Sequence, residues 1–197
     1  FEDTVAAYCG AQYAVAMNSG TSALHAACFA AGIGPGAEVI TTPITFVATS
    51  NSVLYCGGRP VFADIREDSV NIDPVEIRAK ITPATRAIIP VHFAGCPVEL
   101  EEIRSIAQQN GLIVIEDAAH AIDSKIGERY CGTMGDIGIY SFDAVKNLSI
   151  GEAGGLTSRH PEMAKKARQL RYCGIGKSAM QKSLEAGGKR DGRWWEY

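Results

Sequence analysis

Residues 112–120 read LIVIEDAAH, an almost wholly aliphatic run that ends in two carboxylates and an imidazole. An amphipathic helical pattern covers residues 98–110 just before it, and a glycine ends that helix. Aliphatic strands without polar alternation are typical of a parallel sheet covered on both faces. The stretch therefore predicts a central strand of an α/β sheet, with Glu116, Asp117 and His120 at its carboxyl end.

The alternation of strand and helix patterns continues in both directions from this stretch. It predicts strands at 13–18, 38–41, 60–65, 86–93, 137–142 and 154–158, and helices at 21–31, 46–55, from 73 onward, and at 161–172. Such alternation predicts a three-layer α/β/α fold with a mainly parallel, mixed sheet. We expect one large domain over residues 1–186, and a glycine-rich connector with the start of a truncated segment over 187–197.

Composition narrows the function classes. The chain has 197 residues, 46% of them hydrophobic, and a formal net charge of −3, so we expect a real core and no nucleic-acid partner. No apolar run reaches the ~18–20 residues of a membrane span, and no signal peptide is recognisable, which favours the cytoplasm. The chain starts without methionine, so we expect a fragment of a longer protein.

Six cysteines are scattered along the chain without a C-x-x-C pair. A disulfide framework or a structural zinc site normally clusters its cysteines. We therefore expect free thiols in a reducing compartment and no metal site.

Two polar clusters follow predicted strands, where α/β sheets bind their ligands. The turn from Ser19 to Ser22 opens a helix, whose free backbone N–H groups and hydroxyls favour a phosphate. An ordinary helix cap by Ser19 or Thr21 is the alternative. Asp117 beside His120 indicates either a ligand contact or a structural ion pair.

Two further residues have the right place for a planar, carbonyl-bearing ligand. Lys146 follows the predicted strand 137–142, and an amine at such a strand end suits imine chemistry. The alternative is an ordinary surface lysine. Phe46 follows the predicted strand 38–41 and could stack on a planar ring, or simply pack in the core.

In order and spacing, these motifs resemble the DegT/DnrJ/EryC1/StrS family of sugar aminotransferases, over nearly the whole chain. The matching segments are NSGTSAL at 18–24, PITFVAT at 43–49, IPVHFAG at 89–95, IEDAAHA at 115–121, and Ser141-Phe142 up to Lys146. The resemblance implies the large domain of a fold-type-I enzyme dependent on pyridoxal 5′-phosphate (PLP). It also implies a smaller C-terminal domain, missing here, and a homodimer with active sites at the subunit interface.

The resemblance implies roles at the reacting end of the cofactor. Lys146 would hold PLP as an imine and later move the proton between substrate and cofactor carbons. Asp117 would pair with the pyridine nitrogen and keep it protonated, which makes the ring a better electron sink. His120 would lie near the phenolic oxygen. Phe46 would cover one face of the ring, and the small Ala119 would leave room on the other.

The phosphate end is implied in the same way. Thr21, Ser22 and Ser141 would hold the phosphate, beside the glycine turn at Gly20. Two departures from the family pattern stand out: Asp143 occupies a position where histidine is common, and Ala153 is inserted into the usual Gly-Glu-Gly-Gly loop.

The implied reaction moves an amino group from an amino acid, glutamate in this family, to a keto group of a nucleotide-linked sugar. A sugar dehydratase of the same fold is one alternative, although those enzymes carry histidine in place of Lys146. An inactive truncated module that serves as a folded partner is the other.

Overall fold

In a computed structural model of the chain, residues 1–176 are described. The predicted domain limit at 186 and the connector over 187–197 lie outside the described residues. Within residues 1–176, no helix is both long and apolar enough to cross a membrane. All six cysteines lie within these residues and are free thiols.

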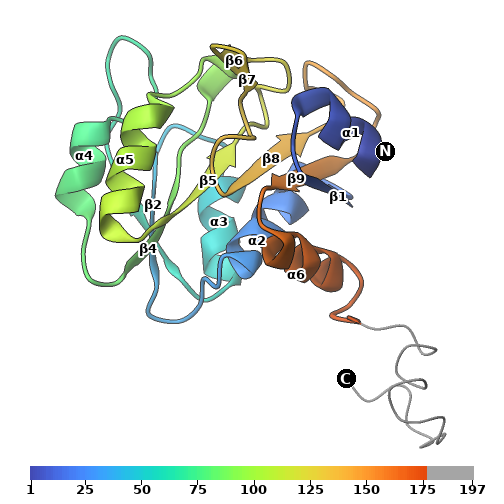
Figure 1. Cartoon of the computed structure of the whole chain (residues 1–197). Helices are drawn as coiled ribbons and strands as arrows, with labels where there is room; N and C mark the ends of the chain where they lie inside the picture. Colours follow the sequence, from blue (N-terminus) through green and yellow to red (C-terminus); the bar gives the residue numbers. More distant parts are fainter. Residues whose placement is uncertain (177–197) are drawn as a thin grey trace, which may run out of the picture.

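A seven-stranded sheet forms the middle of the molecule (Figure 1). Its order is β1-β9-β8-β5-β4-β2-β3, and β9 runs opposite to the other six strands. The strands are β1 (Tyr13–Met17), β2 (Glu38–Thr41), β3 (Arg59–Phe62), β4 (Thr85–Ile89), β5 (Ile113–Asp117), β8 (Ile137–Ser141) and β9 (Gly154–Ser158). The predicted α/β fold with a mainly parallel, mixed sheet is confirmed.

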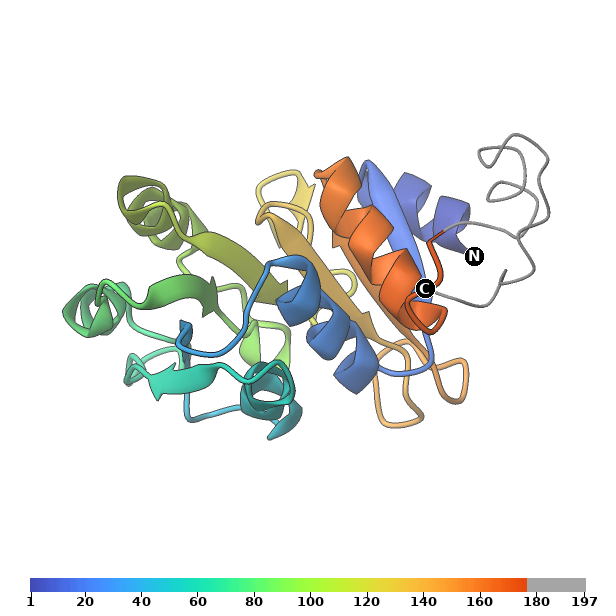
Figure 2. The ribbon, with the colours of Figure 1, turned by 90° about the horizontal axis from the view of Figure 1, so that it is seen from below.

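Helices cover both faces of the sheet. One core cluster joins the sheet to α2 (Gly20–Ala30), α3 (Ala48–Tyr55) and α6 (Pro161–Arg171). A second joins its other face to α1 (Glu2–Cys9), α4 (Pro74–Lys80) and α5 (Leu100–Asn110). Neighbouring strand residues enter different clusters, as Ile88 and Ile89 do, because successive side chains of a strand point to opposite faces. Figure 2 shows α6 beside β1 at one end of the sheet.

Local sequence signals set the helix ends. The side chains of Ser19 and Ser22 form a capping box at the start of α2. Asp73 caps α4, whose first residue is Pro74. Gly111 ends α5 in the left-handed conformation with φ 65°.

The predicted strand over 86–93 was too long. Regular pairing stops at Ile89, because Pro90 has no N–H to donate to a ladder. A short 3₁₀ helix, η1 (Phe93–Gly95), follows, with Ala94 at φ 50°. The predicted helix over 46–55 begins only at Ala48, which leaves Phe46 outside it.

Helix α1 and a small hairpin were not predicted from the sequence. Helix α1 has no strong apolar stripe: Cys9 is its one buried residue, and the partly buried Val5 packs against the same core cluster. A hairpin of β6 (Lys125–Ile126) and β7 (Arg129–Tyr130) turns over two residues. Strands of two residues are too short to produce a readable alternation of polar and apolar residues.

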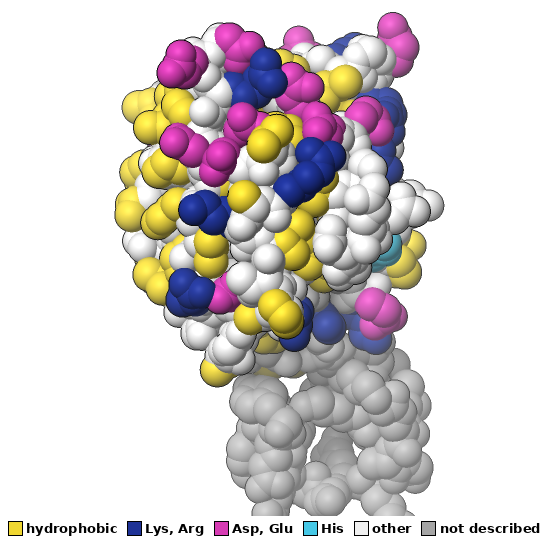
Figure 3. Space-filling model, turned by 90° about the vertical axis from the view of Figure 1, so that its left-hand side faces the viewer, with side chains coloured by type: hydrophobic (Ala, Val, Ile, Leu, Met, Phe, Trp, Pro, Cys, Tyr) yellow, Lys and Arg dark blue, Asp and Glu magenta, His cyan; other side chains and the backbone are white. Residues whose placement is uncertain are grey.

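On the face seen in Figure 3, acidic and basic side chains are interspersed. Several of them pair between or within elements on the side of α4 and α5. Examples are Arg78 with Glu102 at 2.7 Å, and Arg104 with Glu101 at 3.3 Å. This face therefore presents no large field of one sign.

Candidate cofactor-binding site

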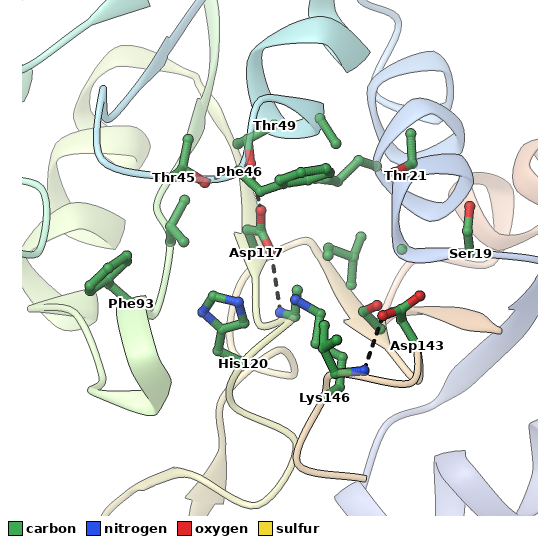
Figure 4. A pocket seen from close by; sticks show the side chains of 18 of the residues that line it. Ser19, Thr21, Thr45, Phe46, Thr49, Phe93, Asp117, His120, Asp143 and Lys146 are labelled. Atoms are coloured by element: carbon green, nitrogen blue, oxygen red, sulfur yellow. Dashed lines mark hydrogen bonds between the residues drawn. The ribbon is translucent and has the colours of Figure 1, made fainter. Parts of the chain in front are cut away.

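A cavity of about 650 Å³ opens at the carboxyl ends of the strands (Figure 4). Most residues singled out in the sequence line it, and they come from segments far apart in the chain: Gly20, Thr21, Phe46, Asp117, Ala119, His120, Ser141 and Lys146. Ser22 does not belong to the lining. The cavity lies where ligands bind in open α/β sheets.

One end of the cavity is a narrow cradle built by the start of α2. A Cβ added to Gly20 would lie only 2.8 Å from the Cβ of Ser141, so glycine permits this close approach. A Cβ added to Gly154 would lie 2.2 Å from the carbonyl oxygen of Ser19. The free N–H groups of the first helical turn and the positive end of the helix dipole favour an anion here.

The Ser22 hydroxyl is engaged in hydrogen bonds within its own segment. Its hydroxyl accepts the backbone N–H of Ser19 at 3.1 Å and donates to Oδ1 of Asn18 at 2.6 Å. The hydroxyl thus faces back along the chain and completes the capping box. Thr21 and Ser141, in contrast, line the cavity.

Asp117 ends β5 at the base of the cavity and is almost completely buried. Its Oδ1 accepts the backbone N–H of Ala119 at 3.2 Å, and its Oδ2 accepts the hydroxyl of Thr49 at 2.8 Å. Burial raises the pKa of Asp117, and these two donors and His120 offset only part of that effect. A carboxylate can accept about four hydrogen bonds, so Asp117 keeps acceptor capacity for a ligand.

Glu116 lies on the other face of β5, and its carboxylate has no capacity left to accept a further hydrogen bond. It accepts hydrogen bonds from Nε2 of His92 at 3.1 Å and from the backbone N–H groups of Gly132, Met134 and Gly135. Burial alone would raise the pKa of Glu116, but these donors outweigh it and lower the pKa. The pair of carboxylates in the sequence is therefore divided between the cavity and the protein interior.

Lys146 and His120 lie on the same side of the cavity (Figure 4). Lys146 is half-buried, so its side chain is not turned out into bulk water. Burial lowers the pKa of His120; the nearby charge of Lys146 acts in the same direction, and Asp117 opposes it. The three groups therefore influence one another electrostatically.

The two departures from the family pattern make local backbone hydrogen bonds, and Asp143 also lines the cavity. The Asp143 carboxylate accepts the backbone N–H of Val145 at 3.1 Å, and its carbonyl oxygen accepts that of Lys146 at 2.9 Å. Among residues 1–176, no ion pair joins Asp143 to Lys146. Ala153 accepts the N–H of Phe142 at 2.9 Å and so extends the pairing of β8 with β9.

The sequence reasoning missed part of the lining. Phe46 is 68% exposed at the rim, so it is not a core residue. Thr45 lines the cavity, and its hydroxyl bonds that of Thr49 at 2.8 Å. Thr45 lies three residues before α3, and the two hydroxyl residues close together in the chain were the available signal. Phe93 also lines the cavity, and its position in an irregular segment gave no signal.

These groups fit PLP, a ligand with a phosphate at one side, a pyridine N–H donor and an aldehyde. The Gly20 cradle suits the phosphate, the spare lone pairs of Asp117 suit the N–H, and the amine of Lys146 suits the aldehyde. Within the part of the chain that the structure describes, no group of three or more His, Cys, Asp or Glu side chains is arranged to hold a metal ion.

Comparisons with known proteins agree with this fit. Residues 1–189 match the model of the DegT/DnrJ/EryC1/StrS aminotransferase family. The chain is 49% identical over 179 residues to the spore coat polysaccharide biosynthesis protein SpsC of Bacillus subtilis, which is 91% of this chain and 46% of that protein.

Two solved structures are similar as well. DesV of S. venezuelae, in complex with a ketimine intermediate, has a TM-score of 0.87 and 38% identity, over 90% of this chain and 48% of that one. NtdA of Bacillus subtilis, with bound cofactor PMP, has a TM-score of 0.81 and 38% identity, over 87% and 39%.

The chain thus spans about half the length, or less, of these relatives. The predicted cofactor, PLP, is confirmed by the family and by NtdA. The site geometry, the family match and the structural likeness lead to one conclusion: this chain belongs to the DegT/DnrJ/EryC1/StrS aminotransferase family.

Proposed function

We propose that the protein containing this chain transfers an amino group from an amino acid, glutamate, to a keto group of a nucleotide-linked sugar. The observation that carries the proposal is that Lys146 and Asp117, which follow different strands, line one cavity. A sugar substrate is supported by the likeness to SpsC, whose name places it in polysaccharide biosynthesis. The nucleotide and the donor rest on the family resemblance.

In this proposal PLP, when bound, carries the amino group between the two substrates and delocalises the electrons of the bond that breaks. Lys146 supplies the amine that holds the cofactor, and then acts as the general acid and base that moves a proton at the reacting carbon. Asp117 accepts a hydrogen bond from the pyridine nitrogen and keeps it protonated.

Other lining residues bind and orient. Gly20, Thr21 and Ser141 hold the phosphate at the start of α2, where the helix dipole favours an anion. His120 would lie near the phenolic oxygen of the ring. Phe46 covers one ring face from the rim, and we assign Ser22 to the phosphate site only through the capping box that shapes it.

A homodimer is part of the proposal. Two apolar side chains that line the cavity, Phe46 and Val145, are well exposed, and so is Val47 beside Phe46 in the chain. Exposed apolar surface of this kind marks protein contacts. We place the large domain at residues 1–186 and the reaction in the cytoplasm, a reducing compartment that suits six free thiols.

The test is cofactor attachment in the full chain. Protein incubated with PLP and reduced with borohydride is mapped by peptide mass spectrometry, and we expect the cofactor on Lys146. Lys146→Ala should carry no label and lose transamination, because both the anchor and the proton carrier are gone. Lys165→Ala is the matched control, since Lys165 lies on the surface of α6.

Three outcomes contradict the proposal. If wild-type protein shows no imine absorbance with PLP, the alternative of an inactive truncated module is favoured. Turnover near the wild-type rate in Lys146→Ala removes the catalytic assignment. Loss of a sugar hydroxyl without amination would identify a dehydratase instead.

A further inference from the structure

Helix α3 supplies the Asp117 carboxylate with a hydroxyl donor. Thr49, in the first turn of α3, is completely buried, and its hydroxyl donates to Oδ2 of Asp117 at 2.8 Å. Thr45, one turn earlier, bonds the same hydroxyl at 2.8 Å and lines the cavity. Figure 4 shows Thr49 directly beside Asp117.

Which hydroxyl donates in each of these two hydrogen bonds follows from counting the available protons. A threonine hydroxyl has one proton to donate. Thr49 gives its proton to Asp117, so the bond between Thr45 and Thr49 must take its proton from Thr45. Ala119 donates its backbone N–H to the other carboxylate oxygen. Asp117 therefore receives two hydrogen bonds, and Thr45 orients one of the two donors, an arrangement that suits the ionised carboxylate.

The need for such donors comes from burial. Asp117 has lost its water, which raises its pKa. His120 and Lys146 face it across the cavity, and His92 lies behind it after β4. Nδ1 of His92 accepts the N–H of Val98 and its Nε2 bonds Glu116, so both ring nitrogens are engaged away from Asp117. Helix α3 gives Asp117 a hydroxyl donor but no charged side chain.

We propose that Thr49, oriented by Thr45, is a positioning residue that keeps the Asp117 carboxylate ionised and its free lone pairs turned into the cavity. Thr49 occupies Oδ2 from the side of α3, with Thr45 bonded to the Thr49 hydroxyl, and Ala119 occupies Oδ1. The remaining acceptor sites face the space where a pyridine N–H would lie. This inference rests on the proposed function, in which Asp117 pairs with that nitrogen.

The test compares Thr49→Val, which keeps the shape and removes the hydroxyl, with Thr49→Ser, which restores it. Thr45→Val removes only the second hydroxyl. Ser52→Ala is the matched control: Ser52 is buried on the same helix, but its hydroxyl bonds the carbonyl oxygen of Thr49 and the thiol of Cys28. All four variants are made in the full chain.

The first readout needs no cofactor. The Asp117 carboxyl is titrated by NMR with ¹³C-labelled aspartate and assigned with Asp117→Asn. A hydrogen bond to a charged group is worth enough to move the midpoint upward by roughly one to two pH units in Thr49→Val. Thr45→Val should move it less, and Thr49→Ser and Ser52→Ala should titrate like the wild type.

The second readout is the dissociation constant of PLP, measured by absorbance titration. We expect it to rise about 10- to 100-fold in Thr49→Val and to return to within a few-fold of wild type in Thr49→Ser. A change of folding alone would affect Thr49→Val and Ser52→Ala alike, so the control separates the two causes.

The outcomes distinguish this inference from the proposed function. If Thr49→Val has the same Asp117 titration midpoint and the same PLP dissociation constant as the wild type, the positioning role is overturned, even if Lys146 carries the cofactor. A shifted Asp117 titration in a protein that never binds PLP supports the role of Thr49 in holding the carboxylate and refutes the proposed function. Should Thr49→Val fail to fold, an unshifted Asp117 midpoint in Thr45→Val overturns the inference.

Discussion

Glu116 and Asp117 are neighbours on β5, yet the two faces of the strand use their carboxylates in opposite ways. Glu116 is enclosed by four donors, the ring of His92 and three backbone N–H groups. Asp117 has two donors and faces a cavity. Both are buried, so the number of donors rather than exposure distinguishes them.

The comparison shows how burial can serve stability on one face and binding on the other. A saturated carboxylate recovers its lost hydration and ties separate segments together, here the end of β4 and the turn before β8. A half-satisfied carboxylate remains costly until a ligand supplies the missing donor. The pKa directions agree, because the pKa of Glu116 is lowered and that of Asp117 is raised.

The largest expected effect comes from removing the saturated carboxylate. Glu116→Ala strands His92 and three backbone N–H groups without an acceptor. We expect the free energy of unfolding in urea to fall by about 3–5 kcal/mol, the range for breaking a buried pair. Asp117→Ala in cofactor-free protein should cost clearly less. Equal losses at the two positions would end the distinction drawn between the faces.

The second prediction concerns how the stability of the cofactor-free protein depends on pH. The pKa of Glu116 is lowered by folding, so its stabilisation is complete above the unfolded pKa and is lost as pH falls through the folded pKa. The pKa of Asp117 is raised, so its contribution is complete below the unfolded pKa and is lost as pH rises through the folded pKa.

Urea unfolding at a series of pH values tests both signs. The deficit of Glu116→Gln relative to wild type should shrink toward acid pH. Asp117→Asn should become more stable relative to wild type as pH rises. If the two variants change with pH in the same direction, the carboxylates do not have the opposite roles that we assign.

The smallest effect is expected where pairing occurs without burial. Arg78 pairs with Glu102 at 2.7 Å, but their side chains are 47% and 43% exposed. Solvent screens such a pair, so Arg78→Ala should lower the free energy of unfolding by less than ~1 kcal/mol. Thermal or urea unfolding measures it. If Arg78→Ala lowered the free energy of unfolding as much as Glu116→Ala does, ion pairing itself, rather than burial among several donors, would determine the size of the effect.

Patterns within one segment were readable from the sequence. The aliphatic run of β5, the apolar stripe of α5 and the Asp73-Pro74 helix start each depend on neighbours in the chain, and each was predicted close to its observed limits. The predicted strand over 86–93 was too long, because Pro90 has no N–H to continue the ladder beyond Ile89. The hairpin β6–β7 was missed because two-residue strands have no readable period.

The sequence by itself determined the fold class and the family, and it named most of the residues that line the cavity. Only the tertiary structure decided how those residues divide their work. It turned Ser22 back into a helix cap, enclosed Glu116 and brought Thr49 to Asp117. The physical reason is that a side chain's role depends on which donors and acceptors surround it, and these come from segments distant in the chain.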